Sequence, residues 1–136
     1  MLVLIKILIC LFQVIHCLIG LSTSDKRNLN YIKIEEIFLM EIEEYYVIFS
    51  LPECMSCLTL NEYLEKSFSQ LDLIYLIDIS SQEYKNNLMQ KNNVGVSSFT
   101  DIQINKAPTL LFIKSKVIID QIEGLEVVHS YLEKQF

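Results

Sequence analysis

The sequence contains no tryptophan and only three glycines and two prolines among its 136 residues. So few chain breakers, together with a hydrophobic fraction of 51%, exclude a disordered or fibrous protein and predict a domain with a real core. Basic residues are also scarce, since 11 Lys and Arg stand against 17 Asp and Glu, a formal net charge of −6. A surface of this charge is a poor match for nucleic acid, and we expect no nucleic-acid partner.

Charge is almost absent from the first 22 residues, where Lys6 is the single charged side chain. Residues 7–21 form an apolar run that is shorter than the stretch of about 20 residues needed to span a membrane as a helix. The run suits a signal peptide, and Gly20 and Ser22 are spaced like the small residues of a cleavage site. We therefore expect residues 1–22 to be a signal peptide or an uncleaved membrane anchor. The protein would then work outside the cytoplasm, secreted or anchored.

A polar linker, residues 23–30, separates this segment from residues 31–136, which we expect to fold as one domain. The spacing of apolar residues predicts alternating helices and strands in that domain. In chain order these are an amphipathic helix with Ile34, Ile37, Phe38 and Ile42 on one face, a strand at 45–51, a helix carrying Leu60, Leu64 and Phe68, a strand at 71–79, a polar helix at 80–93, strands at 109–113 and 117–122, and a final helix at 125–136.

The connections between these elements predict a mixed sheet. Residues 114–116 join the last two strands, and so short a connection allows only an antiparallel hairpin. The strands at 45–51 and 71–79 are separated by a helix, as in a parallel βαβ unit. We therefore expect an α/β domain in which a mixed central sheet ends in a C-terminal antiparallel hairpin.

Two cysteines, Cys54 and Cys57, stand three positions apart where the strand at 45–51 gives way to a helix. A thiolate is the species that attacks a disulfide, and an exposed helix N-terminus favours the thiolate through its unpaired N–H groups. Cys57, one helical turn further along, would lie on the same side and attack a mixed disulfide formed on Cys54. The spacing therefore predicts Cys54 as the nucleophile and Cys57 as the resolving cysteine.

Two other uses of the cysteine pair are open to the sequence. A structural disulfide, oxidised once after export, would use the same spacing. A zinc site is a poorer match, because two cysteines supply half of a tetrahedral ligand set and His129, the only histidine beyond residue 22, has no second ligand pair nearby. We expect no metal, and thiol exchange itself requires no cofactor.

The order of elements and two motifs resemble the thioredoxin family over roughly residues 31–136. VIFSLPECMSC, residues 47–57, resembles the strand that leads into the redox motif, and KAPTLLFIKSKVIIDQIEG, residues 106–124, resembles the cis-proline turn, hairpin and glycine of the family. The resemblance implies a thioredoxin-like three-layer sandwich and a thiol–disulfide oxidoreductase. It further implies a cis peptide bond before Pro108, which frees the Ala107 backbone to pair with an extended substrate.

The sequence also departs from the thioredoxin pattern around the dithiol. Ile48 occupies the strand position where thioredoxins keep a buried acid, so proton transfer to Cys57 must use water or another group. Glu53 replaces the tryptophan before the motif, and Met55 and Ser56 replace the glycine and proline between the cysteines. We expect the Met55 side chain, placed between the two thiols, to contact substrate.

These features predict a reductase or isomerase that acts on exported proteins or peptides containing disulfides or thiols. An unidentified redox partner would exchange electrons with its dithiol. Glu53 favours the reducing direction, because its carboxylate disfavours a second negative charge on Cys54. An exported acidic thioredoxin-like chain is similar to the accessory proteins of bacteriocin or peptide-export systems, with membrane contact only through residues 1–22. The alternative is a redox-inactive thioredoxin-fold module that binds a partner through Met55, Ala107 and Pro108.

Overall fold

The computed structural model describes residues 3–9, 28–80 and 92–136. Residues 3–9 form a short helix, and no helix within these three ranges is long and apolar enough to cross a membrane. The rest of the predicted export segment lies outside the described residues, as does nearly all of the polar helix predicted at 80–93.

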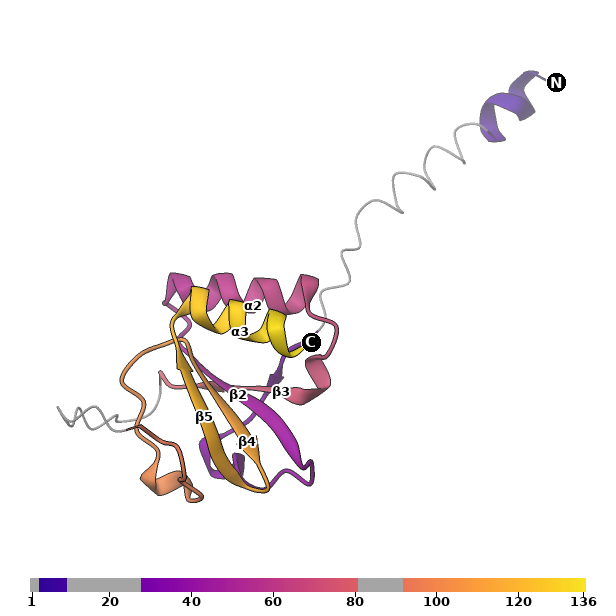
Figure 1. Cartoon of the computed structure of the whole chain (residues 1–136). Helices are drawn as coiled ribbons and strands as arrows, with labels where there is room; N and C mark the ends of the chain where they lie inside the picture. The colour runs from indigo at the N-terminus through magenta and orange to yellow at the C-terminus, as the bar shows by residue number, and fades with distance from the viewer. Residues whose placement is uncertain (1–2, 10–27, 81–91) are drawn as a thin grey trace.

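A five-stranded mixed sheet forms the centre of the domain (Figure 1), with the strand order β1-β3-β2-β4-β5. Its strands are β1 (Asn30–Tyr31), β2 (Glu44–Ser50), β3 (Ile74–Asp78), β4 (Thr109–Lys114) and β5 (Val117–Glu123). β3 runs parallel to both β1 and β2, whereas β4 runs antiparallel to β2 and β5. The mixed sheet and its C-terminal hairpin are therefore confirmed.

The hairpin turn is set by two residues with left-handed backbones. Lys114 and Val117 form the last strand pair, and between them Ser115 and Lys116 have φ angles of 50° and 62°. Positive φ at both central positions is the signature of a type I′ turn, whose twist matches that of the flanking strands. The turn leads β5 back along β4 toward the end of the sheet at which β4 begins.

Helices α2 (Met55–Ser67) and α3 (Leu125–Gln135) lie side by side on one face of the sheet (Figure 1). Their apolar residues recur every three to four positions, which gives each helix one stripe that faces the strands. This stripe and the strand residues on the same face form one core cluster: Tyr46, Ile48, Leu60, Leu64, Phe68, Leu71, Ile74, Leu76, Leu110, Ile122, Val128 and Leu132.

The opposite face of the sheet is covered by short 3-10 helices and irregular chain among the described residues. η1 (Ile34–Glu36) and η3 (Phe99–Asp101) belong to this layer, and η2 (Leu71–Leu73) leads into β3. A second core cluster lies beneath it: Ile37, Phe38, Tyr45, Val47, Phe49, Ile77, Ile79, Ile102, Ile104, Leu111, Ile113 and Ile118. The arrangement is a thioredoxin-like α/β sandwich.

The amphipathic helix predicted before β2 is wrong. The residues just before it pair with the edge of the sheet as β1, and the Ile32 N–H extends this pairing by donating to the Leu76 carbonyl at 2.9 Å. The Glu36 carboxylate then closes η1 by accepting from the Lys33 N–H at 2.7 Å. Helical structure is limited to this one short turn, after which Ile37 is buried in the core and its carbonyl accepts from the Tyr45 hydroxyl of β2.

Candidate active site

Cys54 is the N-cap residue of α2. Its backbone is extended, with φ −85° and ψ 116°, and its sulfur accepts a hydrogen bond from the Cys57 N–H at 3.2 Å. The sulfur thus occupies the place of the side-chain oxygen that usually caps a helix, where unpaired N–H groups favour negative charge. Pro52 and Glu53 between β2 and this cap are exposed, so the thiol lies at the surface.

Both cysteines are free thiols, and they differ in exposure. Cys54 is partly exposed, whereas Cys57 is completely buried. Cys57 precedes Leu60 and Leu64 on the stripe of α2 that faces the sheet, and all three side chains have no exposed surface. An incoming disulfide can therefore reach Cys54 first, and Cys57 stands behind it.

The environment of Cys57 favours the neutral thiol. Burial raises the pKa of Cys57, and the neighbouring Cys54 side chain raises it further. Hydrogen bonds from the Leu51 backbone and from the Ser50 side chain act in the opposite direction and lower that pKa. Ser50, the last residue of β2, and Leu51, which follows it, therefore favour the charged form of the Cys57 thiol.

The turn before β4 lies against the dithiol, as the resemblance to thioredoxins implied. The peptide bond between Ala107 and Pro108 is cis, and the Cys54 sulfur lies 3.7 Å from the Ala107 carbonyl oxygen. The Gly124 N–H donates to the Pro108 carbonyl at 2.9 Å, which ties the turn to the start of α3. Residues that are far apart in the sequence thus form one surface.

Apolar side chains border the exposed thiol. Met55 is 74% exposed directly beside Cys54, and Leu58 is 46% exposed one turn further along α2. Exposed apolar groups of this size next to an accessible thiol are available for contact with another molecule. Met55 was predicted from the sequence and Leu58 was not, although its position three residues after Met55 on the predicted helix could have indicated it.

The structure also identifies Ser50, which the sequence analysis missed. Ile48 is completely buried, so the position of the thioredoxin acid is apolar here. Ser50 follows it by two residues and is itself buried at the end of β2. Since alternate residues of a strand share a face, a small polar residue two positions after Ile48 was the signal for a second group near Cys57.

His129 has no part in the dithiol site. Its ring lies 4.1 Å from the Tyr63 ring, centroid to centroid, and its Nε2 lies 3.7 Å from Glu133 on the same helix. Within the described ranges, no group of three or more His, Cys, Asp or Glu side chains is arranged to hold a metal ion.

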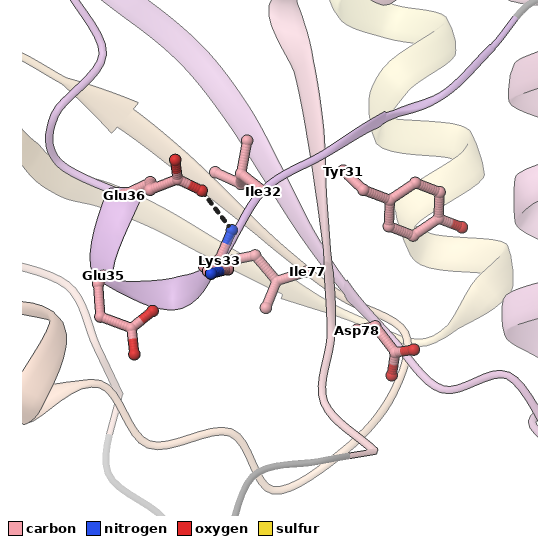
Figure 2. Close-up of a pocket in the computed structure, with 7 residues that line it drawn as sticks. All are labelled: Tyr31, Ile32, Lys33, Glu35, Glu36, Ile77 and Asp78. Atoms are coloured by element: carbon pink, nitrogen blue, oxygen red, sulfur yellow. Dashed lines mark hydrogen bonds between the residues drawn. The ribbon is translucent and has the colours of Figure 1, made fainter.

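A separate pocket of about 570 Å³ lies at the edge of the sheet formed by β1 and β3. Figure 2 shows its lining, in which the Glu36 carboxylate accepts the hydrogen bond from the Lys33 backbone. The lining residues are Tyr31, Ile32, Lys33, Glu35, Glu36, Ile77 and Asp78. Neither cysteine borders this pocket, so it is not part of the candidate active site.

No protein-family model matches the sequence, and no curated protein matches it. Solved thioredoxin structures do match the fold. A thioredoxin of Malassezia sympodialis, from a pan-allergen family, is 15% identical, with 84% of this chain and 96% of that chain covered and a TM-score of 0.52. Thioredoxin f2 of Chlamydomonas reinhardtii is 13% identical, with 79% and 96% covered and a TM-score of 0.54.

The reduced thioredoxin pre-protein of Schistosoma mansoni is a third such structure. It is 17% identical, with 81% of this chain and all of that chain covered and a TM-score of 0.53. The sheet order, the two helices on one face and these likenesses together establish that the chain has the thioredoxin fold.

Proposed function

We propose that this protein is a thiol–disulfide oxidoreductase in which Cys54 is the nucleophile and Cys57 the resolving cysteine. The geometry of the two thiols carries the proposal. Cys54 is the partly exposed N-cap of α2, its sulfur accepts from the Cys57 N–H at 3.2 Å, and Cys57 is buried behind it. A thiol at a helix N-terminus with a second thiol one turn inward is suited to two-step disulfide exchange.

The reaction takes place in two balanced steps. The Cys54 thiolate attacks one sulfur of the substrate disulfide, so that a mixed disulfide forms and the other substrate sulfur leaves as a thiolate. The Cys57 thiolate then attacks the Cys54 sulfur, forms the Cys54–Cys57 disulfide and releases the second substrate thiolate. The substrate gains two electrons, the protein loses two, and solvent protonates the released thiolates.

Substrate binding is proposed at the surface around Cys54. The Ala107 backbone beside the cis bond to Pro108 offers polar groups to an extended chain, and exposed Met55 offers apolar contact. The partners are proteins or peptides that carry disulfides or thiols, together with a protein that returns electrons to the dithiol. One structure of the same fold is a complex of thioredoxin f2 with ferredoxin:thioredoxin reductase, which supports a protein as redox partner.

A disulfide-exchange assay with insulin tests this function. The reduced protein is expected to reduce insulin, and Cys54→Ser is expected to abolish the activity. Cys57→Ser should retain the first step only, and so accumulate a mixed disulfide that mass spectrometry detects after acid quenching. A protein that folds but exchanges with neither insulin nor small disulfides would instead be a redox-inactive binding module.

We further propose that residues 1–22 direct the domain out of the cytoplasm, where its substrates are exported proteins or peptides. The support is the nearly uncharged apolar run in this segment, which is typical of a signal peptide. Fractionation of cells that express the full chain tests the proposal. A signal peptide predicts an exported product beginning at Thr23, and an anchor predicts a membrane-bound product that retains Met1. Soluble cytosolic protein with Met1 intact would contradict both.

A further inference from the structure

Ser50 is the last residue of β2, at the point where the chain leaves the sheet for α2. It shares the helix-covered face of the sheet with Ile48, since side chains two apart on a strand point the same way. Its exposed fraction is only 5%. On α2, Cys57 is the first residue of the buried stripe that continues with Leu60 and Leu64. Ser50 and Cys57 are therefore both buried where β2 is followed by α2, and the Ser50 side chain is near enough to act on the Cys57 thiol.

We propose that Ser50 is a positioning residue for the resolving step, in which its hydroxyl donates a hydrogen bond to the Cys57 thiolate and holds it for attack on Cys54. The inference rests on the proposed exchange reaction and adds a residue to it. The hydrogen bond from Ser50 lowers the pKa of Cys57 against the effect of burial, in agreement with this role. Hydrogen bonding to a charged form favours that form.

The chemistry of the buried thiol explains why a donor is needed. A thiolate taken out of water is unstable unless nearby groups replace its solvation. Ile48, the preceding residue on this face of β2, is apolar and completely buried, so it can neither take a proton nor donate a hydrogen bond. Ser50 donates without carrying charge, and it therefore stabilises the thiolate but does not accept the proton, which must pass to water or another group.

The charged groups around this contact do not replace Ser50. Glu53, on the turn before α2, and Asp78, opposite Ser50 in the β2–β3 register, are both exposed. Their negative charges would oppose a Cys57 thiolate, not stabilise it. From α3, His129 lies against a later turn of α2. The contributions that favour the thiolate come from the Leu51 backbone and Ser50.

The test follows the resolving step alone. Reduced full-length protein carrying Cys10→Ser and Cys17→Ser, which leaves Cys54 and Cys57 as its two thiols, is mixed with Ellman's reagent in a stopped-flow instrument over a range of pH values. Cys54 attack releases one thionitrobenzoate, and Cys57 attack on the resulting mixed disulfide releases another. Ser50→Ala is expected to leave the first release unchanged, to slow the second about tenfold at neutral pH, and to move its pH midpoint upward, because a hydrogen bond to a charged group is lost.

Two comparisons separate hydrogen bonding from packing. Ser50→Thr and Ser50→Val introduce side chains of the same shape, and only the threonine is expected to keep the faster release and the lower pH midpoint. If circular dichroism shows that Ser50→Ala does not fold, the comparison of Ser50→Thr with Ser50→Val replaces it as the test. Thr59→Val removes an exposed hydroxyl from α2, one that donates to the Met55 carbonyl, and should leave the pH midpoint unchanged.

The outcomes distinguish the inference from the function on which it rests. Absence of the second release from the unmodified protein would overturn the proposed exchange reaction. A second release whose rate and pH midpoint are the same with serine and alanine at position 50, or with threonine and valine, would overturn the role of Ser50 alone. A loss of rate with no change of pH midpoint would also overturn it, because packing damage does not act on the thiolate.

Discussion

At the scale of single residues, the site separates the tasks of the two sulfurs by exposure. Cys54 lies partly exposed at a helix cap, and Cys57 lies beneath it in a buried position that raises its pKa. An accessible thiol meets the substrate, whereas a buried thiol is protected from reaction with other disulfides. In the proposed reaction, the same burial makes the resolving step dependent on local hydrogen-bond donors, and we propose Ser50 as one of these.

Met55 provides a prediction about substrate contact. Replacing it with glutamine should raise KM for a peptide or insulin several-fold and leave the reaction with Ellman's reagent unchanged, because a large exposed apolar contact is lost while the thiols are untouched. Steady-state kinetics with both substrates measures the difference. Ile119→Gln is the matched control, since Ile119 is 47% exposed on β5 near the hairpin turn, away from the dithiol. Equal effects of the two substitutions would contradict a role for Met55.

The sequence alone could indicate some of these residues and not others. The spacing of Cys54 and Cys57 after an apolar strand predicted the reactive dithiol. The motif around Pro108 predicted the turn that lies beside it. Ser50 belongs to the same predicted strand. Its importance depends on which face of β2 it occupies and on how deeply α2 buries Cys57, and both are properties of packing, which no spacing of residues reports.

At the scale of the secondary-structure elements, β2 is the strand on which the site and both cores depend. It lies between a parallel and an antiparallel neighbour, and its side chains alternate between the two core clusters. Tyr45 fixes its beginning, because its buried hydroxyl donates to the Ile37 carbonyl at 2.6 Å. The end of β2 is followed by the short turn that leads to Cys54 at the start of α2.

Tyr45 gives the element-scale prediction. Burial raises the pKa of Tyr45 to about 12, above the ordinary tyrosine value of 10.0. Between these pH values the unfolded chain loses the proton and the folded chain keeps it, so stability falls as pH rises, by roughly 2–3 kcal/mol in total. Urea unfolding at a series of alkaline pH values measures the slope. Tyr45→Phe should be less stable at neutral pH but should show a shallower fall, and an unchanged slope would contradict the assignment.

The strands were more predictable than the segment before them. Long β-branched and aromatic runs bounded by turn residues specify β2, β4 and β5 locally, and their predicted bounds differ from the observed bounds by one residue at most. The segment around η1 has the apolar spacing of a helix, yet it forms only one 3-10 turn, and the Ile37 carbonyl after this turn accepts from the Tyr45 hydroxyl of β2. Tertiary hydrogen bonding overrides local periodicity there.

At the scale of the whole molecule, the thioredoxin topology is what assembles the site. The crossover from β2 through α2 to β3 places the dithiol at one end of the sheet, and the entry into β4 places Ala107 and Pro108 at the same end. The fold was foreseen from the order of elements, although the solved thioredoxins it matches are only 12–17% identical. At this identity the shared feature is the fold, and activity must be argued from the site itself.

The most direct test of the central claim, a working Cys54–Cys57 dithiol, is its redox equilibrium with glutathione. The protein is equilibrated in buffers of graded potential, quenched, alkylated and weighed by mass spectrometry. We predict a reversible two-electron transition nearer the reducing end than the oxidising end of the range of about −270 to −120 mV spanned by known dithiols of this kind. Glu53 next to Cys54 and the burial that raises the pKa of Cys57 favour that direction. A disulfide that does not exchange, or a potential at the oxidising end, would contradict the account.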